Sequence, residues 1–149
     1  MIDREREQTS TKPLSSFVLT GCILAELYIG ELLFATHDNI EHLALIEQVI
    51  GPFPGRMLKR AKNIELVNEA FTFDSKGAEF NRLVLPPEKL AYVKRTAPLE
   101  DVVYDEDKWF LRLLRRIMII DPDERYRAEQ LLRFLAHEFH PKMPQDKRW

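Results

Sequence analysis

The stretch SFVLTGCILAELYIGELLFATH, residues 16–37, decides how the rest of the chain can fold. From Phe17 to Ala35 it is almost entirely apolar or small, and its only charged residues are Glu26 and Glu31. A membrane-spanning helix needs about 20 mostly apolar residues and carries few charges near its centre. Because Glu26 is central and no cluster of Lys or Arg flanks the run, the pattern favours a helix buried in a protein core. Such a helix needs neighbours on nearly all faces, and this short chain offers few.

The composition indicates one globular domain. The chain has 149 residues, of which 45% are hydrophobic and 31% charged, as in ordinary soluble domains. Its formal charge of −2 provides no field that would attract nucleic acid or anionic lipid, so we expect neither nucleic-acid binding nor membrane binding. The single cysteine, Cys22, cannot form an internal disulfide, and no secretory signal opens the chain. We expect a reducing compartment, with nuclear or cytoplasmic localisation.

The first half of the chain indicates helices separated by irregular segments. Residues 1–15 are polar and have no apolar period, which predicts a disordered leader. Asp38 and Glu41 have the spacing of a capping box, and apolar residues follow at helical intervals until Gly51 and Pro52 end the pattern. Residues 56–67 can form a short helix. Residues 71–103 contain four Gly or Pro residues and no sustained period, so we expect an irregular, partly extended insert.

The second half indicates two closing helices. The first carries an apolar stripe at i, i+3, i+4, i+7 and i+8. Asp121 with Pro122 is expected to restart the chain as a helix N-cap with proline at N1. The last helix, Ala128 to about Glu138, is expected to bury Leu131, Leu132 and Leu135. The predicted fold class is all-α with one irregular insert. The stripe consists of Phe110, Leu113, Leu114, Ile117 and Met118.

No stretch carries a recognisable catalytic or ligand-binding pattern. The five glycines form neither a G-x-G-x-x-G nor a Walker loop, and no G-x-S-x-G motif occurs. His137 and His140 could offer two imidazoles to a metal, but a catalytic zinc usually has three protein ligands. We interpret them as ordinary histidines at a helix end, and Cys22 as core packing. The sequence therefore predicts no catalytic, cofactor-binding or metal-binding residue in this chain.

Three stretches, taken in order, resemble one family. EHLALIEQVIGP, residues 41–52, is similar to the E-H-L-A-M-M-E-R-I-L-G-P motif of the LAMMER, or Cdc-like, protein kinases, with seven of twelve positions identical. YVKRTAPLEDVV, residues 92–103, resembles an insert of these kinases, and LLRRIMIIDPDERYRAEQLL, residues 113–132, resembles their closing D-P-x-x-R helix pair. The resemblance implies a partial kinase large lobe at 16–140, with an insert at about 54–106 and a tail at 141–149.

The resemblance also implies the role of the apolar run. In these kinases the helix equivalent to 17–34 crosses the middle of the large lobe, surrounded by other helices and the catalytic loop. We therefore expect either the missing kinase segments or a protein partner to cover residues 17–35. The family-motif residues, whose implied role is structural, are Gly21, Glu41, His42, Leu43, Ala44, Glu47, Gly51, Pro52, Asp121, Pro122 and Arg125.

The chain departs from the family pattern where that pattern carries chemistry. Phosphoryl transfer in the family uses a Gly-rich loop, a strand lysine, an H-R-D-L-x-x-x-N loop and a D-F-G motif, and none of these occurs in the 149 residues. Ser16 and Val18 stand where the family has the Asp and Trp of D-x-W-S-x-G. Arg125 aligns with the arginine that pairs with the glutamate of A-P-E. Because that glutamate is absent, we expect Arg125 to be solvated or paired elsewhere.

Two functional hypotheses follow. The first is the C-terminal part of a LAMMER-like serine/threonine, dual-specificity kinase domain. That family uses ATP and Mg²⁺ to phosphorylate protein hydroxyl groups, commonly on serine/arginine-rich splicing factors, and this chain alone is expected to be inactive. The second is a non-catalytic, kinase-derived module that binds a protein partner through its uncovered apolar surface.

Overall fold

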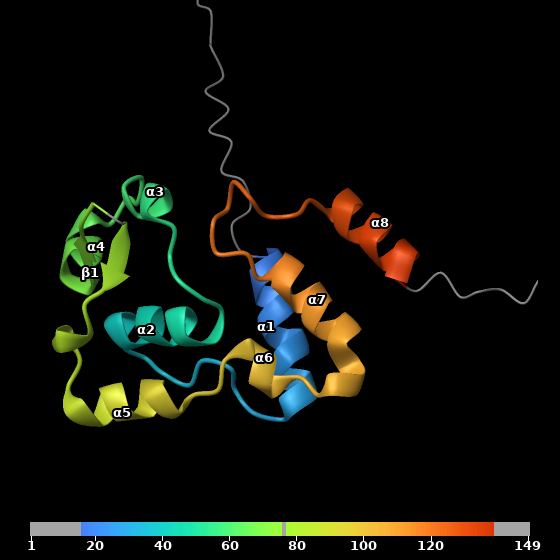
Figure 1. Ribbon diagram of the computed structural model, residues 1–149, viewed down its shortest axis with the longest axis horizontal. Coiled ribbons are helices and arrows are strands. Elements are labelled where there is room, and N and C mark those ends of the chain that lie inside the picture. The colour runs from blue at the N-terminus through green and yellow to red at the C-terminus, as the bar shows by residue number, and fades with distance from the viewer. Residues whose placement is uncertain (1–15, 76, 139–149) are drawn as a thin grey trace, which may run out of the picture.

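The structure, a computed structural model, describes residues 16–75 and 77–138. The predictions for the leader at 1–15, for His140 and for the tail at 141–149 lie outside the described residues. Figure 1 shows the described elements in two groups, with α1, α6, α7 and α8 in one and α2 to α5 with the strands in the other. Each group has a hydrophobic core, called here the first core and the second core.

Helix α1, Ser16–Ile29, is shorter than the apolar run that contains it. It ends at Gly30, whose φ of +79° places the backbone in the left-handed region. The chain then leaves the helix but remains apolar, and the Glu26 carboxylate accepts a hydrogen bond of 3.1 Å from the backbone N–H of Leu33. The expectation of a helix reaching Phe34 was therefore wrong. Among the described residues, no helix has the length and apolar character needed to cross a membrane.

The first core joins the two ends of the described chain. Helix α1 packs against α7, Lys108–Ile117, and α7 also packs against α8, Ala128–Glu138. The short helix α6, Leu99–Val102, adds Leu99, and the 3₁₀ turn η2, Asp105–Asp107, leads into α7. The predicted apolar stripe of α7 is confirmed, because all five of its residues are buried: Phe110, Leu113, Leu114, Ile117 and Met118.

The second core is built from a continuous stretch of chain. It contains α2, Asn39–Val49, with α3, Gly55–Leu58, and α4, Ile64–Ala70. A two-stranded antiparallel hairpin of β1, Phe71–Phe73, and β2, Ala78–Phe80, follows, with Phe71 opposite Phe80. The 3₁₀ turn η1, Arg82–Val84, and α5, Pro87–Arg95, complete it.

Several boundaries differ from the sequence expectations. The insert is more regular than predicted, because a hairpin and two helices, α5 and α6, occupy most of 71–103. Residues 56–67 form parts of two short helices instead of one. Asp121 begins a turn at 121–124 and not a helix, since α8 starts only at Ala128. In α8, Leu131 is buried and Leu135 half-buried, but Leu132 is exposed.

One face of α1 is not covered by either core. Leu19, Ile23 and Leu27 follow one another at four-residue intervals, and they are 57%, 47% and 77% exposed. Residues four apart in a helix lie on the same face, so these three side chains form a continuous apolar line, called here the α1 ridge. The helix is therefore buried on one side, by Gly21 and Ala25 against α7, and its opposite face lacks the neighbours that such an apolar helix needs, as the sequence led us to expect.

Candidate functional site

The N-terminus of α2 is fixed by the side chains that the sequence marked as a capping box. Asp38 accepts a hydrogen bond of 2.9 Å from the backbone N–H of Glu41. This bond, together with the ammonium of Lys89 at 2.9 Å, lowers the pKa of Asp38. The Glu41 carboxylate is largely buried and does not close the box. It accepts instead from the Thr36 hydroxyl at 2.7 Å and pairs with Lys89 at 3.4 Å. Lys89 thus ties α5 to the start of α2, a role that the sequence did not reveal.

The other motif residues of α2 point in different directions. Ala44 is buried in the second core and Leu43 packs at its edge. His42 is exposed, with its ring 5.5 Å from that of Phe34. Glu47 is half-buried, and the loss of solvent raises its pKa although Arg82 acts in the opposite direction. After the helix, Gly51 has a φ of +130°, a conformation that favours glycine, and Pro52 is exposed behind it.

Gly21 allows α1 and α7 to approach each other closely. A Cβ atom at this position would lie 2.5 Å from Cγ of Met118 and 3.1 Å from Cγ2 of Ile117. Carbon atoms in contact are normally about 3.5–4.0 Å apart. The family-motif glycine is therefore required by packing between the two helices.

Asp121 is the polar centre of the contact between α3 and the turn at 121–124. Its side chain is 0% exposed and lies 3.0 Å from Nε of Arg56 and 3.7 Å from an Nη atom of Arg60. Oδ2 accepts from Arg56, and Oδ1, the oxygen nearer Arg60, accepts a hydrogen bond of 3.0 Å from the backbone N–H of Asp123. The same arginines also pair outward, Arg56 with Glu124 and Arg60 with Asp123. Asp121 belongs to the family motif in the sequence, whereas the two arginines were not predicted, and their i, i+4 spacing was the only local signal for them.

Arg125 pairs with the backbone close to it in sequence. Its guanidinium donates to the carbonyl oxygens of Ile119 at 2.8 Å and Ile120 at 3.0 Å. Partial burial lowers its pKa, although Asp121 acts in the opposite direction. The resemblance left two alternatives for Arg125, solvation or pairing with another group. The structure shows the pairing. Pro122, between Asp121 and Arg125, is half-buried in the same turn.

An apolar groove separates the two cores. Its volume is about 340 Å³, and Arg125 and His42 are the only charged or titratable side chains among its described lining residues apart from the thiol of Cys22. Burial raises the pKa of that thiol, and the negative charge of Glu26 raises it further to a smaller extent. The neutral form of the thiol is therefore favoured. The groove is therefore suited to apolar side chains and not to a charged cofactor. The apolar residues that line it from both cores include Phe34, Ile46, Phe53, Met57 and Met118.

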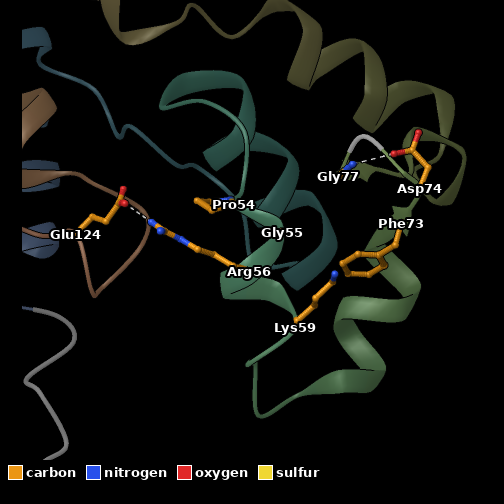
Figure 2. Close-up of a pocket in the computed structure, with 8 residues that line it drawn as sticks. All are labelled: Pro54, Gly55, Arg56, Lys59, Phe73, Asp74, Gly77 and Glu124. Atoms are coloured by element: carbon orange, nitrogen blue, oxygen red, sulfur yellow. Dashed lines mark hydrogen bonds and ion pairs between the residues drawn. The ribbon is translucent and has the colours of Figure 1, made fainter.

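A second, more polar cavity lies on the outer side of α3 (Figure 2). It has a volume of about 500 Å³. Arg56 reaches across it to Glu124, while the side chain of Lys59 extends toward the ring of Phe73. Asp74 accepts a hydrogen bond of 2.9 Å from the backbone N–H of Gly77. The charges lining the cavity are balanced, and no nucleophile with an adjacent base is among the eight residues drawn. Within 16–75 and 77–138, no three His, Cys, Asp or Glu side chains are grouped so as to hold a metal ion.

Comparisons with curated proteins agree on one group of relatives. No protein-family model matches the chain. The chain is 36% identical over 118 residues to the serine/threonine-protein kinase AFC3 of Arabidopsis thaliana, covering 75% of this chain and 28% of the relative. It is 31% identical over 115 residues to the dual specificity protein kinase lkh1 of Schizosaccharomyces pombe, covering 75% of this chain and 16% of the relative. Over 42 residues it is 52% identical to the human dual specificity protein kinase CLK2, covering 28% of this chain and 8% of the relative.

A solved structure extends the similarity to the fold. The crystal structure of a kinase domain matches with a TM-score of 0.65 and 32% sequence identity, covering 80% of this chain and 33% of that structure. The chain thus spans less than a third of AFC3 and about a third of the matched kinase domain. The resemblance found in the sequence is confirmed: the chain is a homologue of the LAMMER, or Cdc-like, protein kinases, and its mostly helical fold is that of a C-terminal part of the kinase large lobe.

Proposed function

We propose that this chain forms the C-terminal part of the large lobe of a LAMMER-like, dual-specificity kinase domain, which phosphorylates protein hydroxyl groups with ATP. In this role its residues supply support and no catalytic group. ATP and Mg²⁺ bind to the complete domain, outside these 149 residues. We further propose that the 149 residues alone are inactive, because the nucleotide-binding and catalytic-loop motifs of the family do not occur among them.

The α1 ridge is the observation that carries this proposal. Full burial of one Leu or Ile side chain contributes about 1.5–3 kcal/mol, and here three such side chains share one exposed helix face. Contiguous apolar surface of this kind is typical of an interface. A further part of the same lobe, lying against α1, would bury the ridge. This arrangement also explains why the helix is apolar beyond the needs of its contacts with α7.

A chimaeric kinase tests the proposal. The segment of AFC3 that aligns with this chain would be replaced by residues 16–138, and phosphate transfer from labelled ATP to a serine-containing peptide would be measured. We expect Mg²⁺-dependent transfer by the chimaera and none by the 149-residue chain. Leu27→Asp in the ridge should reduce transfer by the chimaera strongly, whereas the matched change Leu132→Asp, at a side chain 65% exposed on α8, should leave it within about twofold. A folded but inactive chimaera would refute the assignment.

Activity of the short chain is tested separately. The purified 149-residue chain would be incubated with labelled ATP and Mg²⁺ at several concentrations. Transfer that rises in proportion to the chain, and that is lost with EDTA, would refute the proposed inactivity. Intact AFC3 serves as the positive control in the same assay.

The α1 ridge also favours a second candidate, a non-catalytic module that binds a protein partner through the same face. The two candidates differ in what the ridge contacts. If the chain is such a module, Leu27→Asp should abolish capture of its partner by the 149-residue chain, and the chimaera described above should be inactive. Serine/arginine-rich splicing factors as substrates, and a nuclear or cytoplasmic location, remain expectations from the family resemblance. Phosphorylation of an Arg-Ser repeat peptide by the chimaera is the measurement that tests the substrate.

A further inference from the structure

The two hydrophobic cores meet through apolar residues at their boundary, including Ile120, which follows α7 and packs against the second core. Phe34 packs against both, and the end of α2 reaches the first core through Val49 and Ile50. Between them lies the apolar groove, lined by Cys22 and Met118 from one side and by Phe53 and other residues from the second core. Because the groove is a gap in packing, the apolar contacts that normally make a domain unfold as one unit are reduced along this boundary.

Charged side chains cross the same boundary. Arg56 and Arg60, on and just after α3, belong to the second-core group. Asp121 lies between α7 and α8, the two closing helices of the first core, and directly follows Ile120, which packs against the second core. Asp121 is buried, while both arginines are more than half exposed. A buried carboxylate is stable only while it is paired and hydrogen-bonded. The position of Asp121 therefore depends on α3 remaining in place.

The arrangement differs from ordinary surface ion pairs. Exposed pairs contribute little, because both side chains are solvated whether or not they meet. Here the Asp121 carboxylate accepts hydrogen bonds from Nε of Arg56 at 3.0 Å and from the backbone N–H of Asp123 at 3.0 Å, and an Nη atom of Arg60 lies 3.7 Å away. If α3 moved away, the carboxylate would lose both counter-charges and keep only its hydrogen bond from the backbone N–H of Asp123. Separation of the two cores is therefore opposed at this point by electrostatics.

We infer that Arg56, Arg60 and Asp121 form an electrostatic clasp that couples the two cores, so that they open together while the clasp is closed and separately once it is released. Release would also widen the groove, because Met57 and Ile120, which adjoin Arg56 and Asp121 in sequence, line it. The clasp is a conformational device of this chain, and the inference does not depend on the proposed kinase role.

Native-state hydrogen exchange of the whole chain at low denaturant tests the coupling. The probes are the amides of α5 around Val93 in the second core and of α7 around Leu114 in the first. In the unmodified chain we expect both sets to exchange through the same opening, with the same equilibrium constant and the same denaturant dependence. In Asp121→Asn, which keeps the shape of the side chain and removes its charge, the opening constant of the α5 amides should rise about tenfold or more relative to that of the α7 amides.

A second variant and a matched control complete the test. The double change Arg56→Gln and Arg60→Gln, at exposed positions, should uncouple the cores in the same way if Asp121→Asn fails to fold. Lys59→Gln makes the same kind of charge change beside α3, at an exposed residue that does not contact Asp121, and should leave the two opening constants equal. The inference is overturned if the cores already open separately in the unmodified chain, if the clasp variants shift both constants equally or not at all, or if Lys59→Gln reproduces the uncoupling.

Discussion

Replacing Gly21 with alanine should destabilise the first core by about 1–2 kcal/mol. The new Cβ would lie 2.5 Å from Cγ of Met118, which is buried, and 3.1 Å from Cγ2 of Ile117. Overpacking of this kind typically costs about 1–3 kcal/mol. The replacement of a helical glycine by alanine offsets about 0.5–1 kcal/mol of that cost, because alanine loses less backbone entropy on folding. The steric term is the larger of the two, so we expect a net loss of stability.

Urea unfolding followed by circular dichroism measures this loss. Gly55→Ala is the matched control, because a Cβ there would lie 3.6 Å from the nearest atom, the backbone nitrogen of Ala78, which is an ordinary contact. Without a steric cost, only the gain in backbone entropy applies there, so Gly55→Ala should leave the free energy of unfolding unchanged or raise it by up to about 1 kcal/mol. In a double-mutant cycle, Met118→Ala should relieve the strain of Gly21→Ala, giving a favourable interaction energy of about 1 kcal/mol. A Gly21→Ala chain as stable as the unmodified one would refute the reasoning.

Three further results are expected. Leu114→Ala should lower the free energy of unfolding by about 2–5 kcal/mol, because Leu114 is fully buried, while Leu132→Ala should change it by less than about 0.5 kcal/mol; similar losses in urea titrations would contradict the assigned burial. Tyr28→Phe should cost about 1 kcal/mol, since the hydroxyl donates to Asp107 at 2.7 Å and accepts the backbone N–H of Tyr104 at 3.2 Å; an unchanged urea midpoint would argue against these bonds. The pKa of Asp38 is lowered in the folded chain, so its stabilising contribution is present above its ordinary pKa of 3.8 and is lost as the pH falls through the lowered value. Asp38→Asn, which keeps a good N-cap, should make stability measured by acid titration less dependent on pH in that range; an equal loss of stability with falling pH in the variant and the unmodified chain would refute this.

The sequence predicted those elements in which a local pattern coincides with burial. The stripe on α7 was found because its five apolar residues recur at the helical period and all face the first core. The start of α2 was found because Asp38 and the backbone N–H of Glu41 are only three residues apart. Both features depend on contacts or periods within a few residues of chain.

The sequence predictions that failed concern features that are decided by contacts outside the local sequence pattern. The apolar run concealed the end of α1, because the residues after Gly30 remain apolar and Leu33 is buried without being helical. In α8, the neighbours Leu131 and Leu132 cannot face the same side of a helix, and hydrophobicity does not tell which one is buried. The pairing of Arg56 with Asp121 joins residues 65 apart in sequence. A sequence period reports on residues within one helix or strand, so it cannot reveal a contact over such a separation.

The pairing of α1 with α7 also determines the order in which the chain can fold during synthesis. The second core is continuous in sequence, from α2 to α5, so its contacts can form as soon as those residues have been made. Helix α1 is made before them, but its partner α7 ends at Ile117, 88 residues after Ile29. At roughly 5–20 residues per second, α1 waits about 4–18 s for this partner. During that interval the side of α1 that carries Gly21 and Ala25 has no α7 to pack against, so this apolar surface of the nascent chain is accessible to chaperones.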